Sequence, residues 1–129
     1  MTVCSSDIKD MLEADSQLGL VYKDNLFIGS EPSTPKNCVT IYDTPGFPLD
    51  LSLDQKSLER PSIQIRIRNT NYLTGMALAE KIVISLHGRA QETWNGTLYS
   101  VIICSSGPAL LDWVDNNARI VLNLNMIRR

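Results

Sequence analysis

The segment from residue 61 to residue 88 constrains the fold more than any other part of the chain, because an alternating pattern runs almost directly into a helical one. Successive side chains of a strand point to opposite faces of a sheet. The first eight residues therefore place isoleucines on one face and polar residues on the other: Ile63, Ile65 and Ile67 against Ser62, Gln64, Arg66 and Arg68. This pattern predicts a strand with one face in the core and a polar face that meets solvent, a lumen or a partner.

A long amphipathic helix is predicted to start after Asn71. Apolar residues recur there at spacings of four and three, the period of one helix face: Tyr72, Met76, Ala79, Val83 and Leu86. Asn71 suits the N-cap because its side-chain oxygen can accept a bond from an unpaired backbone N–H. At the other end, His87 lies near the negative end of the helix dipole, and Gly88 tolerates the left-handed conformation of a C-cap.

Length and composition limit the class of protein. With 129 residues, 43% of them hydrophobic and 20% charged, the sequence predicts a single globular domain over residues 1–129. No apolar run approaches the roughly 20 residues needed to cross a bilayer, and the first residues do not resemble a signal peptide, so we expect cytoplasmic synthesis and no membrane contact. A net charge of -2 without a basic run gives no long-range attraction for nucleic acid.

No residue constellation in the sequence is typical of catalysis or metal binding. The only histidine, His87, already has a structural role at the helix end. The string Ile-Tyr-Asp-Thr-Pro-Gly at 41–46 resembles a GTPase switch motif, but no phosphate-binding loop accompanies it, which favours a turn after a strand. We therefore predict no enzyme, no cofactor and no metal site. Neither a disulfide framework nor a zinc site fits the three widely spaced cysteines, Cys4, Cys38 and Cys104.

The remaining pattern predicts an α+β fold. Ser5 or Ser6 can cap a short helix that ends near Asp15. We expect a mainly antiparallel or mixed sheet of about five strands with two helices packed on one face. The strands are expected near residues 26–29, 38–43, 61–68, 96–106 and 119–128. Between them we expect a polar connection at 89–95, a strand stop at Gly107 and Pro108, and a short turn at 110–114.

Residues 44–60 are expected to form a long loop, because they carry two prolines, a glycine and mixed charge without sustained periodicity. Loops of this length in a compact domain are usually functional or disordered. The acidic residues Asp50, Asp54 and Glu59 alternate with Lys56 and Arg60, so solvated charge describes them better than a cation site does.

The predicted sheet has apolar residues on both faces. The strand at 96–106 is apolar on both sides, and the last strand places Val121 and Ile127 opposite its main apolar row. An antiparallel sheet open to water on one side alternates more cleanly than this. Two explanations remain open: another subunit covers part of the second face, or the loop at 44–60 folds back over it.

Five strings follow one another along the chain: Ile-Gly-Ser-Glu-Pro-Ser-Thr-Pro at 28–35, Ile-Tyr-Asp-Thr-Pro-Gly at 41–46, Pro-Ser-Ile-Gln-Ile-Arg-Ile-Arg at 61–68, the Asn71-Tyr72 helix start, and Arg-Ile-Val-Leu-Asn-Leu-Asn at 119–125. In this order they resemble the tail terminator or tail-completion proteins of long-tailed bacteriophages, which include minor capsid and neck proteins. The resemblance covers most of the chain.

The resemblance implies a structural virion protein, assembled in the host cytoplasm, without a cofactor or a bond-making step. It implies a homo-oligomeric ring, commonly a hexamer, that caps the tail tube, ends tail polymerisation and joins the tube to the head connector. Phage DNA would pass through the lumen without sequence-specific binding. A ring needs two different patches on each subunit, and the candidate contact residues are Gln64, Arg66, Arg68, Asp50, Asp54, Lys56 and Arg60.

Two alternative functions stay open at this point. One is a head-side connector or neck adaptor, which would bind the portal complex in place of the tube. The other is a small nucleotide-binding domain that uses the turn from Asp43 to Gly46.

Overall fold

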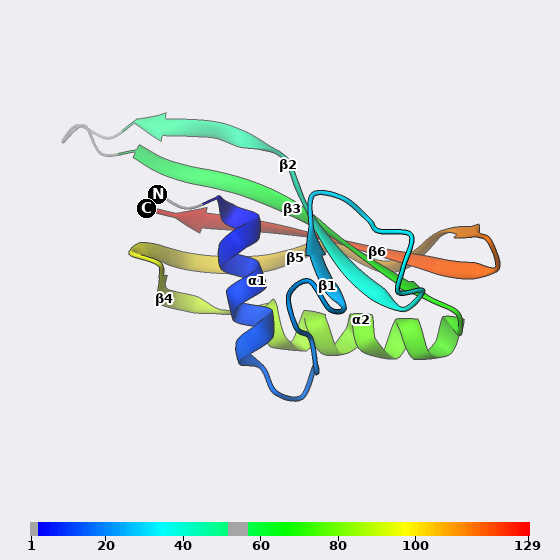
Figure 1. The fold of residues 1–129 in the computed structure, drawn as a ribbon. Helices are drawn as coiled ribbons and strands as arrows, with labels where there is room; N and C mark the ends of the chain where they lie inside the picture. Colours follow the sequence, from blue (N-terminus) through cyan, green and yellow to red (C-terminus); the bar gives the residue numbers. More distant parts are fainter. Residues whose placement is uncertain (1–2, 52–56) are drawn as a thin grey trace.

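Two helices and six strands make up the described part of the chain, residues 3–51 and 57–129 of a computed structural model (Figure 1). The elements are α1 (Cys4–Ala14), β1 (Leu26–Ile28), β2 (Cys38–Leu51), β3 (Ser57–Asn69), α2 (Tyr72–Leu86), β4 (Ala90–Trp94), β5 (Thr97–Val114) and β6 (Asn117–Arg128). The predicted α+β class is confirmed, with six strands where about five were expected. No helix in these ranges is long and apolar enough to span a membrane.

All six strands belong to one mixed sheet, in the order β1-β2-β3-β6-β5-β4. β1 runs parallel to β2, and every other neighbouring pair is antiparallel. Because Ile65 lies opposite both Ile41 and Leu122, the apolar rows of the three central strands share one face. Both helices pack on that face, α1 over β1, β2 and β3, and α2 over β3, β5 and β6 (Figure 1).

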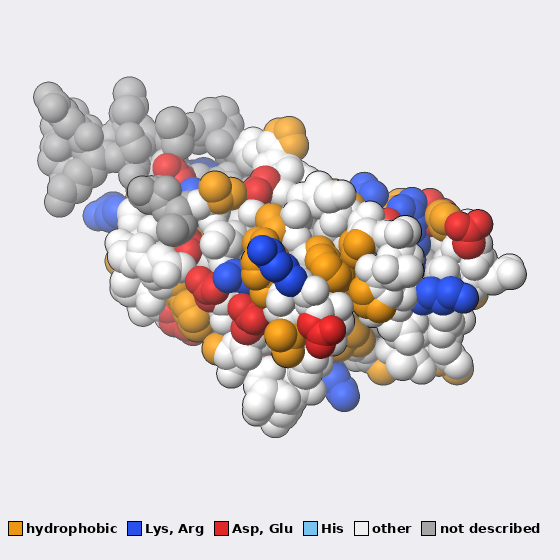
Figure 2. All heavy atoms as spheres, viewed as in Figure 1, with side chains coloured by type: hydrophobic (Ala, Val, Ile, Leu, Met, Phe, Trp, Pro, Cys, Tyr) orange, Lys and Arg blue, Asp and Glu red, His pale blue; other side chains and the backbone are white. Residues whose placement is uncertain are grey.

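Neither helix covers the opposite face of the sheet, which we call the open face. It is defined by alternate side chains of the central strands: Tyr42, Gln64, Arg66, Arg68, Arg119, Val121 and Asn123. On the helix-bearing side, charged side chains of both signs are interspersed with hydrophobic ones (Figure 2).

The core lies between the helices and the apolar face of the sheet. β3 contributes Ile63, Ile65 and Ile67, all fully buried, as its alternation predicts. The surrounding fully buried side chains come from α1, α2 and β6: Ile8, Met11 and Leu12; Ala79, Ile82 and Leu86; Ile120, Leu122 and Leu124. Each large apolar side chain contributes about 1.5–3 kcal/mol by leaving water, so the isoleucine row forms the centre of the core.

The predicted caps of α2 are confirmed. Asn71 accepts a bond from the Thr74 backbone N–H at 3.1 Å, and Gly88 follows the helix with a φ of +88°. The buried stripe is rotated slightly from the prediction, because Ile82 is fully buried and Val83 only partly so.

The N-terminal helix is confirmed, but its predicted serine cap is wrong. α1 begins at Cys4, and its N-cap is Val3, whose side chain makes no capping bond. Ser5 lies inside the helix and bonds to Asp43 of β2. A tertiary contact with β2 therefore stabilises the N-terminal end of α1.

The predicted loop at 44–60 is wrong for its described part, because β2 continues to Leu51 and β3 begins at Ser57, while residues 52–56 lie outside the described residues. We call residues 44–51 and 57–62 the hairpin arm. Two register shifts, between Thr44 and Phe47 and between Phe47 and Asp50, accommodate the prolines of β2. Such irregularities are tolerated because β1 pairs with only three residues of β2, Val39 to Ile41, which leaves the rest of β2 at a sheet edge.

Three further expectations are wrong in the second half of the chain. The polar connection at 89–95 contains β4, and β5 continues through Gly107 and Pro108 to Val114, so residues 110–114 are strand and not turn. Register shifts on either side of the glycine-proline pair absorb the interruption. A two-residue turn then joins β5 to β6, with φ of 50° at Asp115 and 64° at Asn116, as a hairpin turn of type I′ requires.

Candidate assembly surface

The polar residues of β3 lie on the open face, as predicted. A row of hydrogen bonds starts at Arg66, whose Nε donates to Oε1 of Gln64 at 2.8 Å. Gln64 Nε2 donates to Oδ1 of Asn123 on β6 at 3.3 Å, and Asn123 Nδ2 donates to Oγ of Ser106 on β5 at 2.8 Å. The row therefore fixes these side chains across three strands.

Arg66 is held in place by Tyr42 and Gln64, while most of its guanidinium N–H donors make no hydrogen bond within the described residues. Its guanidinium lies 4.8 Å from the centre of the Tyr42 ring on β2, a cation-π distance. Within the described residues one of its five N–H donors is bonded, to Gln64. The geometry suits recognition of a carboxylate or phosphate from outside the subunit.

Arg68 has a different environment, because it holds the connection between β1 and β2 against the sheet. Its Nε donates to the carbonyl oxygen of Lys36 at 3.0 Å, and its Nη2 donates to that of Pro35 at 2.7 Å. Its Nη1 lies 3.8 Å from Oε1 of Glu31 in the same connection. Most of its donors therefore serve the fold of the subunit.

Arg119, which lies opposite Arg68 on the open face, forms an ionic cluster with Asp112 and Glu31. It donates two bonds of 2.6 Å to the Asp112 carboxylate and one of 2.9 Å to Glu31. The bonds from Arg119 lower the pKa of Asp112, and the bonds to Asp112 and Glu31 raise the pKa of Arg119. Both groups stay charged throughout the physiological range.

An apolar hollow of about 160 Å³ lies on the open face beside the hairpin arm. Val101 pairs with Ile127 across it, and Ile103 is 46% exposed. The described residues do not cover this part of the sheet, and the described part of 44–60 extends β2 and β3 and does not fold back. The lining residues are Arg60, Val101, Ile103, Asn125, Met126 and Ile127.

A second exposed apolar surface lies at the far end of β5. We call its four residues the tip patch: Leu110, Leu111, Trp113 and Val114, which are 42%, 43%, 54% and 40% exposed. The Trp113 ring lies 6.5 Å from that of Tyr72 at the start of α2. The open face and the tip patch give the subunit two separate surfaces able to meet other chains.

A family model described as bacteriophage tail terminator protein matches residues 8–127. The chain belongs to the bacteriophage tail terminator family. A chain from the solved structure "Virion of native gene transfer agent (GTA) particle" has the same fold, with a TM-score of 0.70 and 15% identity over 97% of this chain and 93% of that chain. No curated protein matches the sequence. This tail terminator family member is a structural protein of the virion, located in its tail or neck.

The structure places the predicted contact residues of the terminator subunit in different environments. Arg60 lines the hollow and continues the polar row of β3 that contains Gln64 and Arg66. Asp50 lies in β2, opposite Leu58. Asp54 and Lys56 are outside the described residues. The set therefore does not form one cluster, and its role in contacts stays a prediction.

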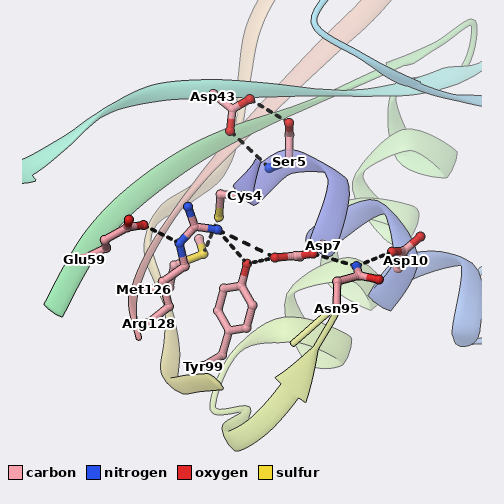
Figure 3. A network of polar contacts seen from close by, with 10 residues as sticks. All are labelled: Cys4, Ser5, Asp7, Asp10, Asp43, Glu59, Asn95, Tyr99, Met126 and Arg128. Atoms are coloured by element: carbon pink, nitrogen blue, oxygen red, sulfur yellow. Dashed lines mark hydrogen bonds and ion pairs between the residues drawn. The ribbon is translucent and has the colours of Figure 1, made fainter. Parts of the chain in front are cut away.

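Sequence reasoning missed a buried polar network that fastens α1 to the sheet (Figure 3). Asp7 is fully buried, and its carboxylate accepts bonds from the Tyr99 hydroxyl and, at 2.7 Å, from Asn95 Nδ2. Arg128 lies 3.6 Å from Asp7 and donates to Glu59 at 2.7 Å. Burial and the bond to Asp7 raise the pKa of Tyr99, so its hydroxyl remains a donor. The network joins α1 to β3, β5 and β6.

Asp43 belongs to a neighbouring contact and not to a turn. Residues 43–46 lie within β2, so the predicted turn there is wrong. The Asp43 carboxylate accepts from the Ser5 backbone N–H at 3.1 Å and from the Ser5 hydroxyl at 2.6 Å. Its role in the subunit is to hold the start of α1. His87 likewise has a structural contact, because its Nδ1 accepts from the Cys104 backbone N–H at 2.9 Å.

Proposed function

We propose that this protein forms a homo-oligomeric ring, a hexamer, on the last ring of the tail tube. The ring halts addition of tube subunits and provides the joint to the head connector, and phage DNA passes through its lumen without sequence-specific binding. The protein performs no bond-making step and needs no cofactor. The observation that carries this proposal is the family match over residues 8–127, which takes in α2, all six strands except Arg128 at the end of β6, and α1 from Ile8 onward.

The surfaces of the subunit support this proposal. A closed ring of identical copies uses two different patches on each copy, and one face of this sheet has an uncovered apolar hollow while the tip patch lies elsewhere. The polar row with Gln64 and Arg66 offers a charged surface to a neighbour, a tube subunit or DNA. Arg60 and Asp50 are proposed to act from the hairpin arm, and Asp54 and Lys56 are proposed as further contact residues.

Electron microscopy of the purified protein tests the ring. We expect particles with a central hole, formed by the protein alone or after addition of tail tubes. Co-sedimentation with purified tubes and purified heads then separates the two positions in the virion. Binding to tubes supports a terminator, binding to heads alone supports a neck adaptor, and a monomer that binds neither at high concentration refutes both.

The nucleotide-binding alternative is tested on Asp43. Because its carboxylate bonds to Ser5, we expect Asp43→Ala to lower the melting temperature equally with and without a nucleotide. A nucleotide-dependent rise in melting temperature that Asp43→Ala abolishes would support the alternative.

A further inference from the structure

The tip patch contains the most exposed aromatic side chain among the exposed hydrophobic residues. Trp113 is 54% exposed, and its three apolar neighbours lie within a five-residue stretch of β5. Single exposed apolar residues are normal, but contiguous groups mark interaction surfaces. Tryptophan is also the residue most enriched among the side chains that dominate interface energies. The tip patch therefore has the composition of an interface centre.

The hollow has the complementary shape and composition. It is concave, holds about 160 Å³ and is lined mainly by aliphatic side chains of β5 and β6. The register places Trp113 beside Ala118 and Val101 beside Ile127, at opposite ends of β6. Nine residues of strand separate these positions, or about 30 Å, so one copy cannot fill its own hollow with its own tip patch.

Trp113 and the hollow lie on opposite faces of the sheet, whereas Val114, the register partner of Asn117, belongs to the row of the open face. Ala118 belongs to the buried row of β6, so Trp113, its partner in register, is on the helix-bearing side. Ile127 and Asn125 belong to the alternate row, so the hollow is on the open face. Each copy thus presents Trp113 on one side of the sheet and the hollow on the other, two different surfaces as head-to-tail association requires.

Polar groups at the two surfaces are complementary as well. Asp115 follows the tip patch in the exposed hairpin turn, and Arg60 lines the hollow. The Trp113 indole N–H has no acceptor, and the Asn125 side chain no hydrogen bond, within residues 3–51 and 57–129. The indole can therefore donate to the Asn125 oxygen of another copy, and Asp115 and Arg60 carry charges of opposite sign.

We propose that the tip patch of one copy packs into the hollow of the next copy, with Trp113 at the centre of the contact. The inference rests on the proposed function for the closure and copy number of the ring. The contact itself depends only on the two surfaces of this chain, so it can fail while the ring proposal stands.

Cross-linking between two introduced cysteines tests the contact. Val114→Cys and Arg60→Cys are combined with Cys104→Ser, which removes the partly exposed native thiol. With a short thiol-to-thiol reagent, head-to-tail contacts join copies into a ladder of covalent oligomers that ends at the size of the ring. An equimolar mixture of the two single-cysteine variants, each in the Cys104→Ser background, should stop at dimers.

Trp113→Ala provides an independent measurement. It should raise the protein concentration at which half of the rings dissociate by at least roughly 30-fold, the effect of losing a central interface residue. Val21→Ala removes an apolar side chain of similar exposure, 52%, from the connection between α1 and β1, and should leave dissociation unchanged. Because Trp113 is more than half exposed, its variant should keep the wild-type melting temperature.

The remaining outcomes overturn the inference in different ways. Dimers formed by Val114→Cys alone would show tip-to-tip pairing, and cross-links from Val114→Cys to the tube protein would show that the tube occupies this surface. Rings visible by microscopy without any cross-linked ladder would refute this contact and leave the proposed function intact. Absence of rings with and without tubes would refute the proposed function itself.

Discussion

Replacing Asp7 with alanine should be one of the most damaging single changes in this protein. The carboxylate is fully buried and is the acceptor that Tyr99 and Asn95 share. Its removal leaves a buried phenol and an amide without that acceptor, and it takes away the ion pair with Arg128. Because α1 carries Ile8, Met11 and Leu12 into the core, loosening its attachment exposes apolar surface as well.

The magnitude follows from the geometry of the network. Hydrogen bonds to a charged group are worth about 1.5–3 kcal/mol each, and breaking a buried ion pair costs about 3–5 kcal/mol. Arg128 keeps its bond to Glu59, and Asn95 keeps its 2.8 Å bond to Asp10, so part of the loss is offset. We expect Asp7→Ala to lower the unfolding free energy by about 3–4 kcal/mol, a large share of the 5–15 kcal/mol typical of a domain.

Asp10 supplies a matched control one turn along the same helix. It accepts from the same Asn95 amide, but its side chain is 31% exposed and its other partner is Lys9. Asp10→Ala should therefore cost less than about 1 kcal/mol. Urea titration and thermal unfolding of the two variants decide the matter, with an expected fall in melting temperature of about 10–20 °C for Asp7→Ala. Equal losses for the two variants would refute the reasoning.

Three other predictions concern the backbone, alkaline stability and the open face. Gly107→Ala should destabilise the fold by at least about 1 kcal/mol more than Gly88→Ala in chemical unfolding. Both glycines have φ near +89°, but an added Cβ at 107 would lie 2.6 Å from the Val121 carbonyl oxygen, whereas nothing lies within 4 Å at 88. Burial raises the pKa of Cys4 from 9.0 to about 12, so the unfolded state releases its proton first, and stability should fall above pH 9 by up to about 1.4 kcal/mol per pH unit. In melting curves recorded at a series of pH values, Cys4→Ala should reduce the fall in melting temperature above pH 9. An equally steep fall in the variant would contradict this explanation. Arg66→Glu should change the unfolding free energy by less than about 1 kcal/mol and weaken ring formation or tube binding in sedimentation assays. Normal assembly would make Arg66 an ordinary solvated residue.

The parts of the fold that the sequence predicted correctly are those that local chemistry specifies. The alternation of β3 depends on the two-residue period of a strand, and the ends of α2 depend on Asn71 and Gly88. Neither requires knowledge of a distant partner. The start of α1 was misassigned because Ser5 is engaged by Asp43, which is 38 residues away in sequence.

The errors at 44–60 and 107–114 have a common cause. Proline and glycine indicate strand breaks, yet residues 44–51 and 107–114 are strand at the edge of the sheet, where register shifts accommodate such residues. Local sequence does not reveal which strand lies at an edge, because strand order depends on pairing across the whole chain. Four apolar residues within the five positions 110–114 were the available signal against a turn.

For the candidate contact residues, too, local sequence predicts the sheet face but not the contacts with distant parts of the chain. Alternation correctly placed Gln64, Arg66 and Arg68 on one face. It could not distinguish Arg66 from Arg68, because that difference arises from the connection between β1 and β2, whose carbonyl groups engage Arg68. The hollow was equally hidden, since it forms only where β3, β5 and β6 come together.

Pro45 of β2 and Pro108 of β5 limit the ways in which copies of the chain can associate. Among the described residues, β2 beyond Ile41 and β5 beyond Cys104 have no strand on their outer sides. Each free edge carries a proline within an irregular register, Pro45 in β2 and Pro108 in β5. A proline cannot donate a ladder hydrogen bond, and an irregular edge pairs poorly with an added strand. Contacts between copies should therefore run through side-chain surfaces such as the tip patch and not through extension of the sheet, which suits a protein proposed to end a polymer without continuing it.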